Sequence, residues 1–299
     1  MEVGVFLYFK ERAIRLIQIL VLLISLAMIV QFELLWIERI KNPAPITAYE
    51  NEESSFREMN LGENGVFYVR ELSKNTKEDF EKVMSICLIY CKYDLSDKKL
   101  ESVDESLYKK LNQYYKEHYK KELKTLEKSI KAIFCDLKYF PIPVSTRKNS
   151  SWINYVNSWG YQRTYGGNRT HEGTDLMADN NMRGYFPVVS MTDGVIENVG
   201  WLEKGGYRIG IRGGNGGYFY YAHLYSYDEN IKEGSKVSAG QVIGYMGDSG
   251  YSKVEGTTGN FDVHLHMGIY ISTDNHQELS INPYWILKSI EGRKLSFSY

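Results

Sequence analysis

The sequence predicts a mainly β domain in the C-terminal half of the chain, preceded by an N-terminal transmembrane helix and an α-helical segment. Three observations support this: a long apolar run near the N-terminus, a helical period of apolar residues in the middle, and short alternating runs between glycines thereafter. The chain has 299 residues, 43% of them hydrophobic, which is enough to bury one catalytic-sized core and a smaller part.

The composition narrows the class of partner. The chain carries 36 lysines and arginines against 37 acidic residues, so no basic field attracts nucleic acid, and we expect no nucleic-acid partner. Three cysteines, at positions 87, 91 and 135, do not suggest a disulfide-stapled fold. We interpret them as small buried apolar residues rather than a metal or redox site. The 25 tyrosines, many in short alternating runs, favour strands.

The apolar run predicts a transmembrane anchor at residues 16–36. Leu16 to Phe32 contains no charged residue, which meets the lower limit of about 17 residues for crossing a bilayer, and Trp36 stands where an interfacial aromatic residue would. The alternative is a buried core helix. Basic residues before the run favour a cytoplasmic N-terminus at residues 1–15, although two basic residues after it weaken that bias.

The same run can also be interpreted as a signal peptide. Ser25-Leu26-Ala27 is a small-x-small triplet of the kind that precedes cleavage, although apolar residues continue beyond it as far as Val30. We expect an uncleaved anchor. Under either interpretation the rest of the chain lies across the membrane.

Residues 37–74 are expected to connect the anchor to the helical segment. They are mostly polar, contain two prolines and two glycines, and include a short strand-like stretch at Val66–Val69. No motif in this part suggests a chemical role. We therefore expect it to act as a connector.

A helical segment is predicted at residues 75–140. Its first helix is expected to follow a cap at Asn75 or Thr76 and to run to about Cys91, and a longer helix begins near Ser102. In the longer helix apolar residues recur every three or four positions, with Lys and Glu between them. The two helices can form an antiparallel hairpin, or the longer one can pair as a coiled coil in a homo-oligomer or with a partner protein.

A domain boundary is predicted at Phe140-Pro141-Ile142-Pro143, because proline lacks an amide donor and disfavours helix in the residue before it. The domain at residues 141–299 consists of short alternating runs separated by glycines, and Gly213–Gly217 is a strong hairpin turn. Strands are expected at Val188–Met191, Val195–Trp201, Tyr207–Arg212, Tyr218–Leu224, Gln241–Met246 and Phe261–Ile271.

Four of the six histidines lie between positions 171 and 266, and their contexts predict a metal site. Gly and Thr between His171 and Asp175 disfavour a helix, so these two side chains are expected to converge where a loop enters a strand. In Val263–Ile269 the odd positions are apolar, which places His264 and His266 together on the opposite face of a strand. A half-buried sheet has no packing reason to place two imidazoles side by side.

The chemistry expected of these histidines is that of a catalytic zinc. His223 follows a strand, at a position from which its side chain can reach a cleft. Two imidazoles and one carboxylate leave a fourth position for water, as in catalytic rather than structural zinc sites. The other two histidines would then serve as general base and as stabiliser of the developing oxyanion. His118, on the charged helix, and His276, in a polar loop, are interpreted as surface residues.

Three motifs resemble those of the lysostaphin-type, LytM-like zinc peptidases. The stretch His171-Glu172-Gly173-Thr174-Asp175-Leu176-Met177-Ala178 is similar to the first zinc motif of that family. Tyr221-Ala222-His223-Leu224 is similar to its middle histidine motif, and His264-Leu265-His266 to its last. The resemblance covers about half of the chain, from roughly Trp159 to Pro283.

The resemblance implies a small open antiparallel sheet of the duplicated-hybrid-motif type, which forms a groove and holds one Zn²⁺. The implied metal ligands are His171, Asp175 and His266. The implied catalytic residues are His223 and His264, with Tyr165 steadying the oxyanion.

One loop departs from the family pattern. Tyr251–Val263 is longer than the glycine-rich turn usual in the family, and Phe261-Asp262-Val263 replaces the small residues that often precede the histidine pair. The longer loop is expected to reshape the groove wall. It leaves all of the metal and catalytic positions intact.

The resemblance further implies a zinc endopeptidase that hydrolyses stem or cross-bridge peptides of bacterial peptidoglycan. That substrate lies outside the membrane, so we expect a single-pass protein of the cell membrane with its catalytic domain on the extracytoplasmic, cell-wall side. The alternative from another class is a catalytically silent member that binds wall or protein partners, but silent members typically lack a ligand. A zinc enzyme acting on another secreted peptide would share the same chemistry.

Overall fold

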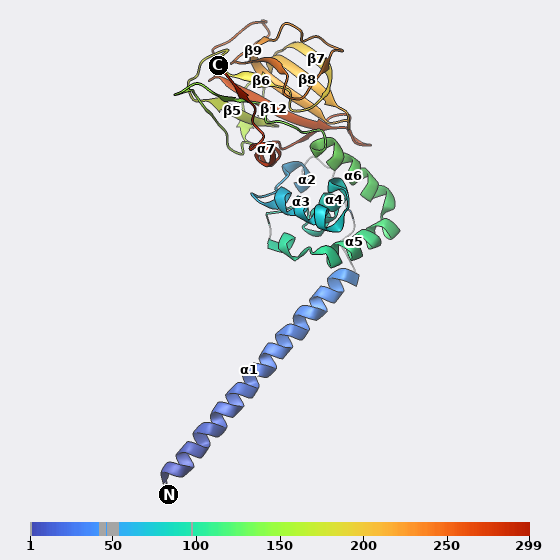
Figure 1. Cartoon of the computed structure of the whole chain (residues 1–299), viewed down its shortest axis with the longest axis vertical. Coiled ribbons are helices and arrows are strands. Elements are labelled where there is room, and N and C mark those ends of the chain that lie inside the picture. The colour runs from blue at the N-terminus through green and yellow to red at the C-terminus, as the bar shows by residue number, and fades with distance from the viewer. Residues whose placement is uncertain (1, 42–45, 47–53, 97) are drawn as a thin grey trace. The chain divides into compact units, whose positions relative to one another are not determined.

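The protein divides into two compact units, Met1–Pro45 and Ile46–Tyr299 (Figure 1). The structure is a computed structural model, and it describes the backbone of residues 2–41, 46, 54–96 and 98–299. Side chains are described from residue 14 to residue 34 and in the second unit.

The first unit is one helix, α1 (Glu2–Lys41). Within it Ile14–Leu34 is a stretch of 21 residues with a mean hydropathy of 2.3, none of it buried. This length and composition suit a membrane-spanning helix, and a signal sequence would have the same properties. The expected interfacial side chain of Trp36 and the prolines of the expected connector, Pro43 and Pro45, lie outside the described residues.

The second unit begins with a helical part that surrounds α4 (Phe80–Tyr90). Val83–Ile89 of α4 are all buried, as expected of a helix at the centre of a bundle. Two short helices, α2 (Ser55–Glu58) and the 3-10 helix η1 (Lys98–Ser102), belong to the same part. The helices that pack against α4 are α3 (Gly65–Thr76), α5 (Glu105–His118) and α6 (Lys120–Phe134).

The strand expected at Val66–Val69 is wrong, because these residues belong to α3. Val66, Val69 and Leu72 are buried while Phe67 is 66% exposed, so burial follows a helical period and not the alternation of a strand. A short window with two valines fits either pattern, and only the continuation of the period distinguishes them.

The ends of the expected helices also differ from the prediction. Asn75 and Thr76 are the last residues of α3, and α4 begins after Asp79. The expected long helix is divided at Tyr119, whose φ of −137° and ψ of 42° lie outside the helical region. Its true cap is Asp104, whose carboxylate accepts a hydrogen bond from the Leu107 amide at 2.7 Å.

The apolar residues of the helical segment are buried against other helices of the same chain. Cys87 and Cys91 are buried in the same bundle, whereas Cys135 is exposed. This packing favours the intramolecular alternative over a coiled coil with another chain. The buried residues of α6 are Leu123, Leu126, Ser129, Ile130, Ala132, Ile133 and Phe134.

The C-terminal part of the second unit is built on an antiparallel sheet, which confirms the predicted fold class (Figure 1). Its main path runs β10-β7-β8-β9-β12-β5-β2, while β11 joins β9 to β6 and β13 pairs with β12. The central strands are β5 (Thr174–Ala178), β7 (Gly194–Leu202), β8 (Gly206–Gly213), β9 (Tyr218–Tyr227) and β12 (His264–Ile271). The others are β2 (Ile153–Asn154), β6 (Pro187–Val189), β10 (Lys236–Val237), β11 (Val242–Met246) and β13 (Leu279–Ile281).

Smaller elements complete the domain. β1 (Val144–Ser145) pairs in parallel with β14 (Ser296–Phe297), and β3 (Gln162–Arg163) pairs with β4 (Arg169–Thr170). The helix α7 (Tyr284–Ile290) follows β13.

The expected alternation along β12 is confirmed. Leu265, Met267 and Ile269 are fully buried in the core, which leaves His264 and His266 on the other face. β12 begins at His264, three residues later than expected. This strand pairs with β9 on one side and with β5 on the other, so it places the histidine pair at the middle of the sheet.

Candidate metal centre and active site

The register of the sheet brings the site residues together. His266 of β12 is paired with Asp175 of β5 on one side and with Ala222 of β9 on the other. His171 lies just before β5, and His223 directly follows Ala222. Strand pairing therefore assembles histidines that are far apart in the sequence.

The donor atoms of His171, Asp175 and His266 converge. Asp175 Oδ1 lies 2.9 Å from His266 Nδ1 and 3.1 Å from His171 Nε2, and the two nitrogens are 3.0 Å apart. Tetrahedral ligands about 2.0–2.1 Å from a zinc ion would be about 3.3–3.4 Å from one another. The triangle is slightly tighter than this, and its two nitrogens and one oxygen fit a single ion.

Outer contacts orient two of these side chains. His171 Nδ1 lies 3.1 Å from the Ser158 carbonyl, which assigns the proton to Nδ1 and turns Nε2 toward the cluster. Arg163 Nη2 donates to Asp175 Oδ2 at 2.6 Å, so the second carboxylate oxygen is also held. Such partners typically set the orientation and the metal affinity of a ligand.

Two further features suit this cluster to a cation. A side chain at Gly173 would place its Cβ 2.3 Å from His266 Cε1, so glycine is required for this close approach. Burial alone would raise the pKa of Asp175, but hydrogen bonds with His171 and His266 hold that pKa well below its usual range. The carboxylate is therefore charged.

His223 and His264 stand beside the cluster, with ring centroids 4.7 Å apart. Nδ1 of His223 lies 2.8 Å from the Ser249 carbonyl, and Nδ1 of His264 lies 2.7 Å from the Asp262 carbonyl. This assigns the proton of each ring to Nδ1 and leaves Nε2 as an acceptor. Burial lowers the pKa of both imidazoles, which keeps them neutral and able to take up a proton.

The backbone of His223 is in an uncommon conformation. Its φ of 61° lies in the left-handed region, which residues other than glycine rarely adopt. Its amide donates to the Gly205 carbonyl at 2.8 Å, and its ring is held by Ser249. Gly206 allows this approach, because a Cβ there would lie 2.2 Å from the Ser249 carbonyl oxygen. Surrounding contacts thus hold a strained residue in place, as is common at functional sites.

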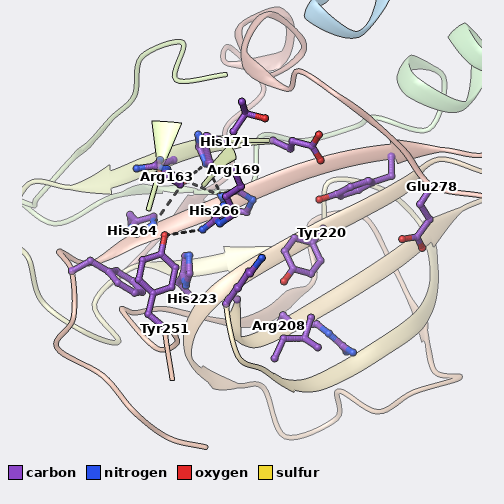
Figure 2. A pocket seen from close by; sticks show the side chains of 18 of the residues that line it. Arg163, Arg169, His171, Arg208, Tyr220, His223, Tyr251, His264, His266 and Glu278 are labelled. Atoms are coloured by element: carbon purple, nitrogen blue, oxygen red, sulfur yellow. Dashed lines mark hydrogen bonds and ion pairs between the residues drawn. The ribbon is translucent and has the colours of Figure 1, made fainter. Parts of the chain in front are cut away.

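The five residues line an open cavity of about 880 Å³ (Figure 2). The loop after β11 supplies part of its wall, where the ring of Phe261 lies 4.6 Å from that of His223. The long loop noted in the sequence therefore contacts both His223 and His264 directly. Further lining residues are Arg163, Arg169, Arg208, Tyr220, Tyr251 and Glu278.

Tyr165 is not among the residues that line this cavity. Its ring stacks on Tyr251, with centroids 4.5 Å apart, and its hydroxyl lies 3.5 Å from Glu203 Oε1. Tyr251 lines the cavity instead, and Arg169 Nη2 donates to its hydroxyl at 3.3 Å. The structure thus brings together His171, Asp175, His223, His264 and His266, and places Tyr165 behind Tyr251.

Sequence reasoning missed most of the remaining residues of the cavity lining, among them Arg163, Arg208 and Tyr251. A signal existed for Tyr251, because the loop that begins with it was already identified as unusually long. Arg163 and Arg208 lie in stretches where an arginine is an ordinary surface residue, and only the folded chain shows what they face.

Residues 169–283 match Peptidase family M23, a span that contains the whole metal cluster and both neighbouring histidines. A crystal structure from Ruminococcus gnavus, of a candidate glycyl-glycine endopeptidase lytM, is 40% identical and superimposes with a TM-score of 0.70. The superposition covers 87% of this chain and 97% of that one. The chain belongs to peptidase family M23.

Curated relatives carry peptidase names. The L-Ala–D-Glu endopeptidase of Bacillus subtilis is 43% identical to this M23 chain over 152 residues, which are 51% of this chain and 43% of the relative. The glycyl-glycine endopeptidase ALE-1 of Staphylococcus capitis is 37% identical over 111 residues, which are 35% of this chain and 28% of the relative. The chain spans less than half the length of these relatives.

M23 membership confirms the expected family of metallopeptidases. The R. gnavus structure covers 87% of this chain, which is more than the β domain alone can supply. The helical part of the second unit therefore belongs to the shared architecture as well.

Proposed function

We propose that this chain is a zinc-dependent endopeptidase that hydrolyses stem or cross-bridge peptides of bacterial peptidoglycan. The observation that carries the proposal is the triangle of donor atoms from His171, Asp175 and His266, with sides of 2.9 to 3.1 Å, beside two buried histidines. The names of its relatives, an L-Ala–D-Glu and a glycyl-glycine endopeptidase, support hydrolysis of peptide bonds.

One Zn²⁺ per catalytic domain would be held by His171 Nε2, Asp175 Oδ1 and His266 Nδ1. Zinc in such a site polarises a scissile carbonyl and lowers the pKa of a water molecule to about 7. The chain contributes the orientation of the ligands, because Arg163 and the Ser158 carbonyl hold two of them from behind.

His264 is the residue best placed to accept a proton. Its Nε2 lies 3.8 Å from Asp175 Oδ1, at the edge of the ligand triangle. Because Nδ1–H is held by the Asp262 carbonyl, a proton is taken up at Nε2 and can be returned from there to the leaving amine. His264 is therefore assigned as the general base and then the general acid.

His223 is assigned to the oxyanion. Its Nε2 can take up a proton from solvent in the open cavity and then donate a hydrogen bond to the negative oxygen that develops in the transition state. Burial lowers the pKa of the resting ring, and a negative charge forming nearby favours its protonated state. A tyrosine hydroxyl can add a second donor, and Tyr251 lines the cavity with Tyr165 stacked behind it.

The location we propose is the cell membrane. Ile14–Leu34 would act as a single-pass anchor, preceded by a cytoplasmic N-terminus. The second unit would then lie on the extracytoplasmic, cell-wall side, where peptidoglycan is found. In the sequence, the helical part lies between this anchor and the peptidase domain at residues 141–299.

The test uses the purified full-length protein in detergent, with measurement of bound zinc and of new amino termini released from purified peptidoglycan. Wild type is expected to release amino termini, and His264→Ala to keep its zinc but act at least about 100-fold more slowly. Removal of the metal with a chelator should abolish activity, and added zinc should restore it. His118→Ala is the matched control, because His118 is exposed on α5, outside the cavity.

The same experiment separates hydrolysis from the alternative, a catalytically silent protein that binds the wall. Wild type that carries zinc and binds peptidoglycan but releases no amino termini would contradict the proposal. All three ligands and both histidines line one cavity, and this arrangement favours hydrolysis.

A further inference from the structure

The cavity extends from the metal cluster past Tyr220 of β9 to Arg208 of β8 (Figure 2). Tyr220 lies between the two, with its ring 6.1 Å from that of the ligand His266. The backbone of Arg208 is held in the sheet, because its amide donates to the Tyr227 hydroxyl at 3.1 Å. Arg208 is therefore a fixed residue of the cavity wall, one aromatic side chain away from the proposed catalytic centre.

The guanidinium of Arg208 has no partner among the residues that the structure describes. Its Nη1 is buried without a hydrogen bond, and the side chain forms no ion pair in that part of the chain. Arg208 as a whole is half-buried, but a buried donor without an acceptor is unfavourable, so the position of its Nη1 in a cavity indicates a ligand. Other arginines of the domain form ion pairs: Arg163 with Asp175, Arg183 with Asp248 and Arg212 with Glu197.

The neighbours of Arg208 do not neutralise it. The hydroxyls of Tyr218 and Tyr220 are nearby, but burial raises the pKa of both, so they are uncharged at neutral pH. Glu278 also lines this end of the cavity, yet its carboxylate lies 4.0 Å from Arg212. Arg208 thus faces a wall that is polar but carries no opposing charge close to it.

Other carboxylates of the cavity lining are already engaged. Glu172 accepts a hydrogen bond from Arg57 at 2.9 Å, and Asp175 belongs to the metal cluster. Arg169 and Lys204 add two further positive charges to the lining. The electrostatic field of the cavity therefore favours an anionic peptide.

We propose that Arg208 is a specificity residue that binds a free carboxylate of the substrate, next to the bond that is cut. The substrate class is then a peptide with an acidic residue at this position, in preference to a neutral glycine bridge. Arginine suits this role because its guanidinium can donate two parallel hydrogen bonds to the two oxygens of one carboxylate. This inference rests on the proposed peptidase function and narrows its substrate.

The test uses the purified full-length protein and two synthetic peptides that differ in one group. In the first peptide the residue beside the scissile bond carries a free carboxylate, as in an alanyl-glutamate sequence, and in the second it carries the carboxamide. Wild type is expected to cleave the carboxylate peptide with a kcat/KM about 10- to 100-fold higher, as for a charged hydrogen bond that forms in one case and not in the other.

Substitutions at Arg208 should remove this preference selectively. Arg208→Gln is expected to lower kcat/KM for the carboxylate peptide toward that for the carboxamide peptide, so that the ratio of the two values falls to about 1. Arg208→Lys keeps the charge but loses the paired donors, so an intermediate preference is expected. Lys236→Gln is the control: Lys236 is an exposed cation on β10 and is not in the cavity lining, so wild-type preference should remain.

Measuring the affinity of both peptides for the His264→Ala variant, which is expected not to cleave them, tests this inference separately from the proposed function. Equal affinities of the two peptides, or a carboxylate preference that survives in Arg208→Gln, would overturn the role of Arg208 even if wild type cleaves both. Tighter binding of the carboxylate peptide without any cleavage by wild type would overturn the peptidase function and support the carboxylate site. Thermal melting checks the fold of each variant, and if Arg208→Gln unfolds, Arg208→Lys and the binding comparison decide.

Discussion

The helical part and the sheet of the second unit are both well packed, but their buried residues have different roles. Ile86 of α4 and Ile130 of α6 are fully buried apolar residues, and other apolar residues of similar volume could fill such positions. The sheet domain also buries His171, His223 and His264, which are held by specific hydrogen bonds. The difference teaches that a pattern of apolar residues specifies the helices, whereas the identity of single residues specifies the site.

The two parts meet at Arg57, a residue of α2 whose side chain is only 9% exposed. Its guanidinium donates to the Ser280 carbonyl on β13 and to Glu172 Oε1, both at 2.9 Å. Glu172 directly follows His171, a proposed metal ligand, in the sequence. The helical part therefore contacts the segment that carries this residue.

The largest expected effect comes from removing a ligand while leaving the core intact. His266→Ala should abolish zinc binding and lower peptidase activity by at least about 10³-fold, because the metal supplies several kcal/mol of charge stabilisation. Circular dichroism should still show the helices. Zinc content and release of amino termini measure the outcome, and wild-type zinc with full activity would show that the site lies elsewhere.

A core substitution in the helices should lower the stability of the fold and leave zinc binding and activity unchanged. Ile130→Ala is expected to lower the free energy of unfolding by about 2–5 kcal/mol, because it leaves a cavity at a fully buried position. Zinc content and activity per folded molecule should be unchanged. Denaturant titration measures the loss, with Lys128→Ala as an exposed control on the same helix that should stay within about 0.5 kcal/mol of wild type. If Ile130→Ala lost activity while keeping wild-type stability, the proposed division of roles between the helices and the sheet would be wrong.

The smallest expected effect lies at the contact between the two parts. Arg57→Met should lower the free energy of unfolding by about 1.5–3 kcal/mol, because it removes charged hydrogen bonds to Ser280 and Glu172. A modest fall in activity should accompany it, since Glu172 adjoins a ligand. Lys74→Met, which removes an exposed ion pair with Glu71, is the control and should change stability by less than about 1 kcal/mol. Equal stability of the two variants would mean that Arg57 does not join the parts.

Much of the sheet and of the metal cluster could be predicted from the sequence. Apolar residues alternate along β12, so His264 and His266 must share the opposite face of the strand. This follows from the pleat of a strand alone. Convergence with Asp175 also followed, because a short loop leading into a strand keeps ligands close. These are local properties, and local properties can be read from a single sequence.

What could not be predicted depends on contacts between distant segments. Arg57 and Glu172 are 115 positions apart, and no periodicity links them. Tyr251 lines the cavity and Tyr165 stacks on it, and the sequence could not show this contact because the two residues are far apart in the chain. The helix at Val66–Val69 was missed for another reason, namely that two valines fit a strand as well as a helical turn.

The pairing of β12 with β5 determines when the cluster of His171, Asp175 and His266 can form. His266 and Asp175 are 91 positions apart in the chain, and the bond pattern between these two strands is what aligns them. A slip of one residue would turn both histidines of β12 into the hydrophobic interior. Until these two strands pair in register, the chain has no cluster of His171, Asp175 and His266, so the proposed hydrolysis requires the folded sheet.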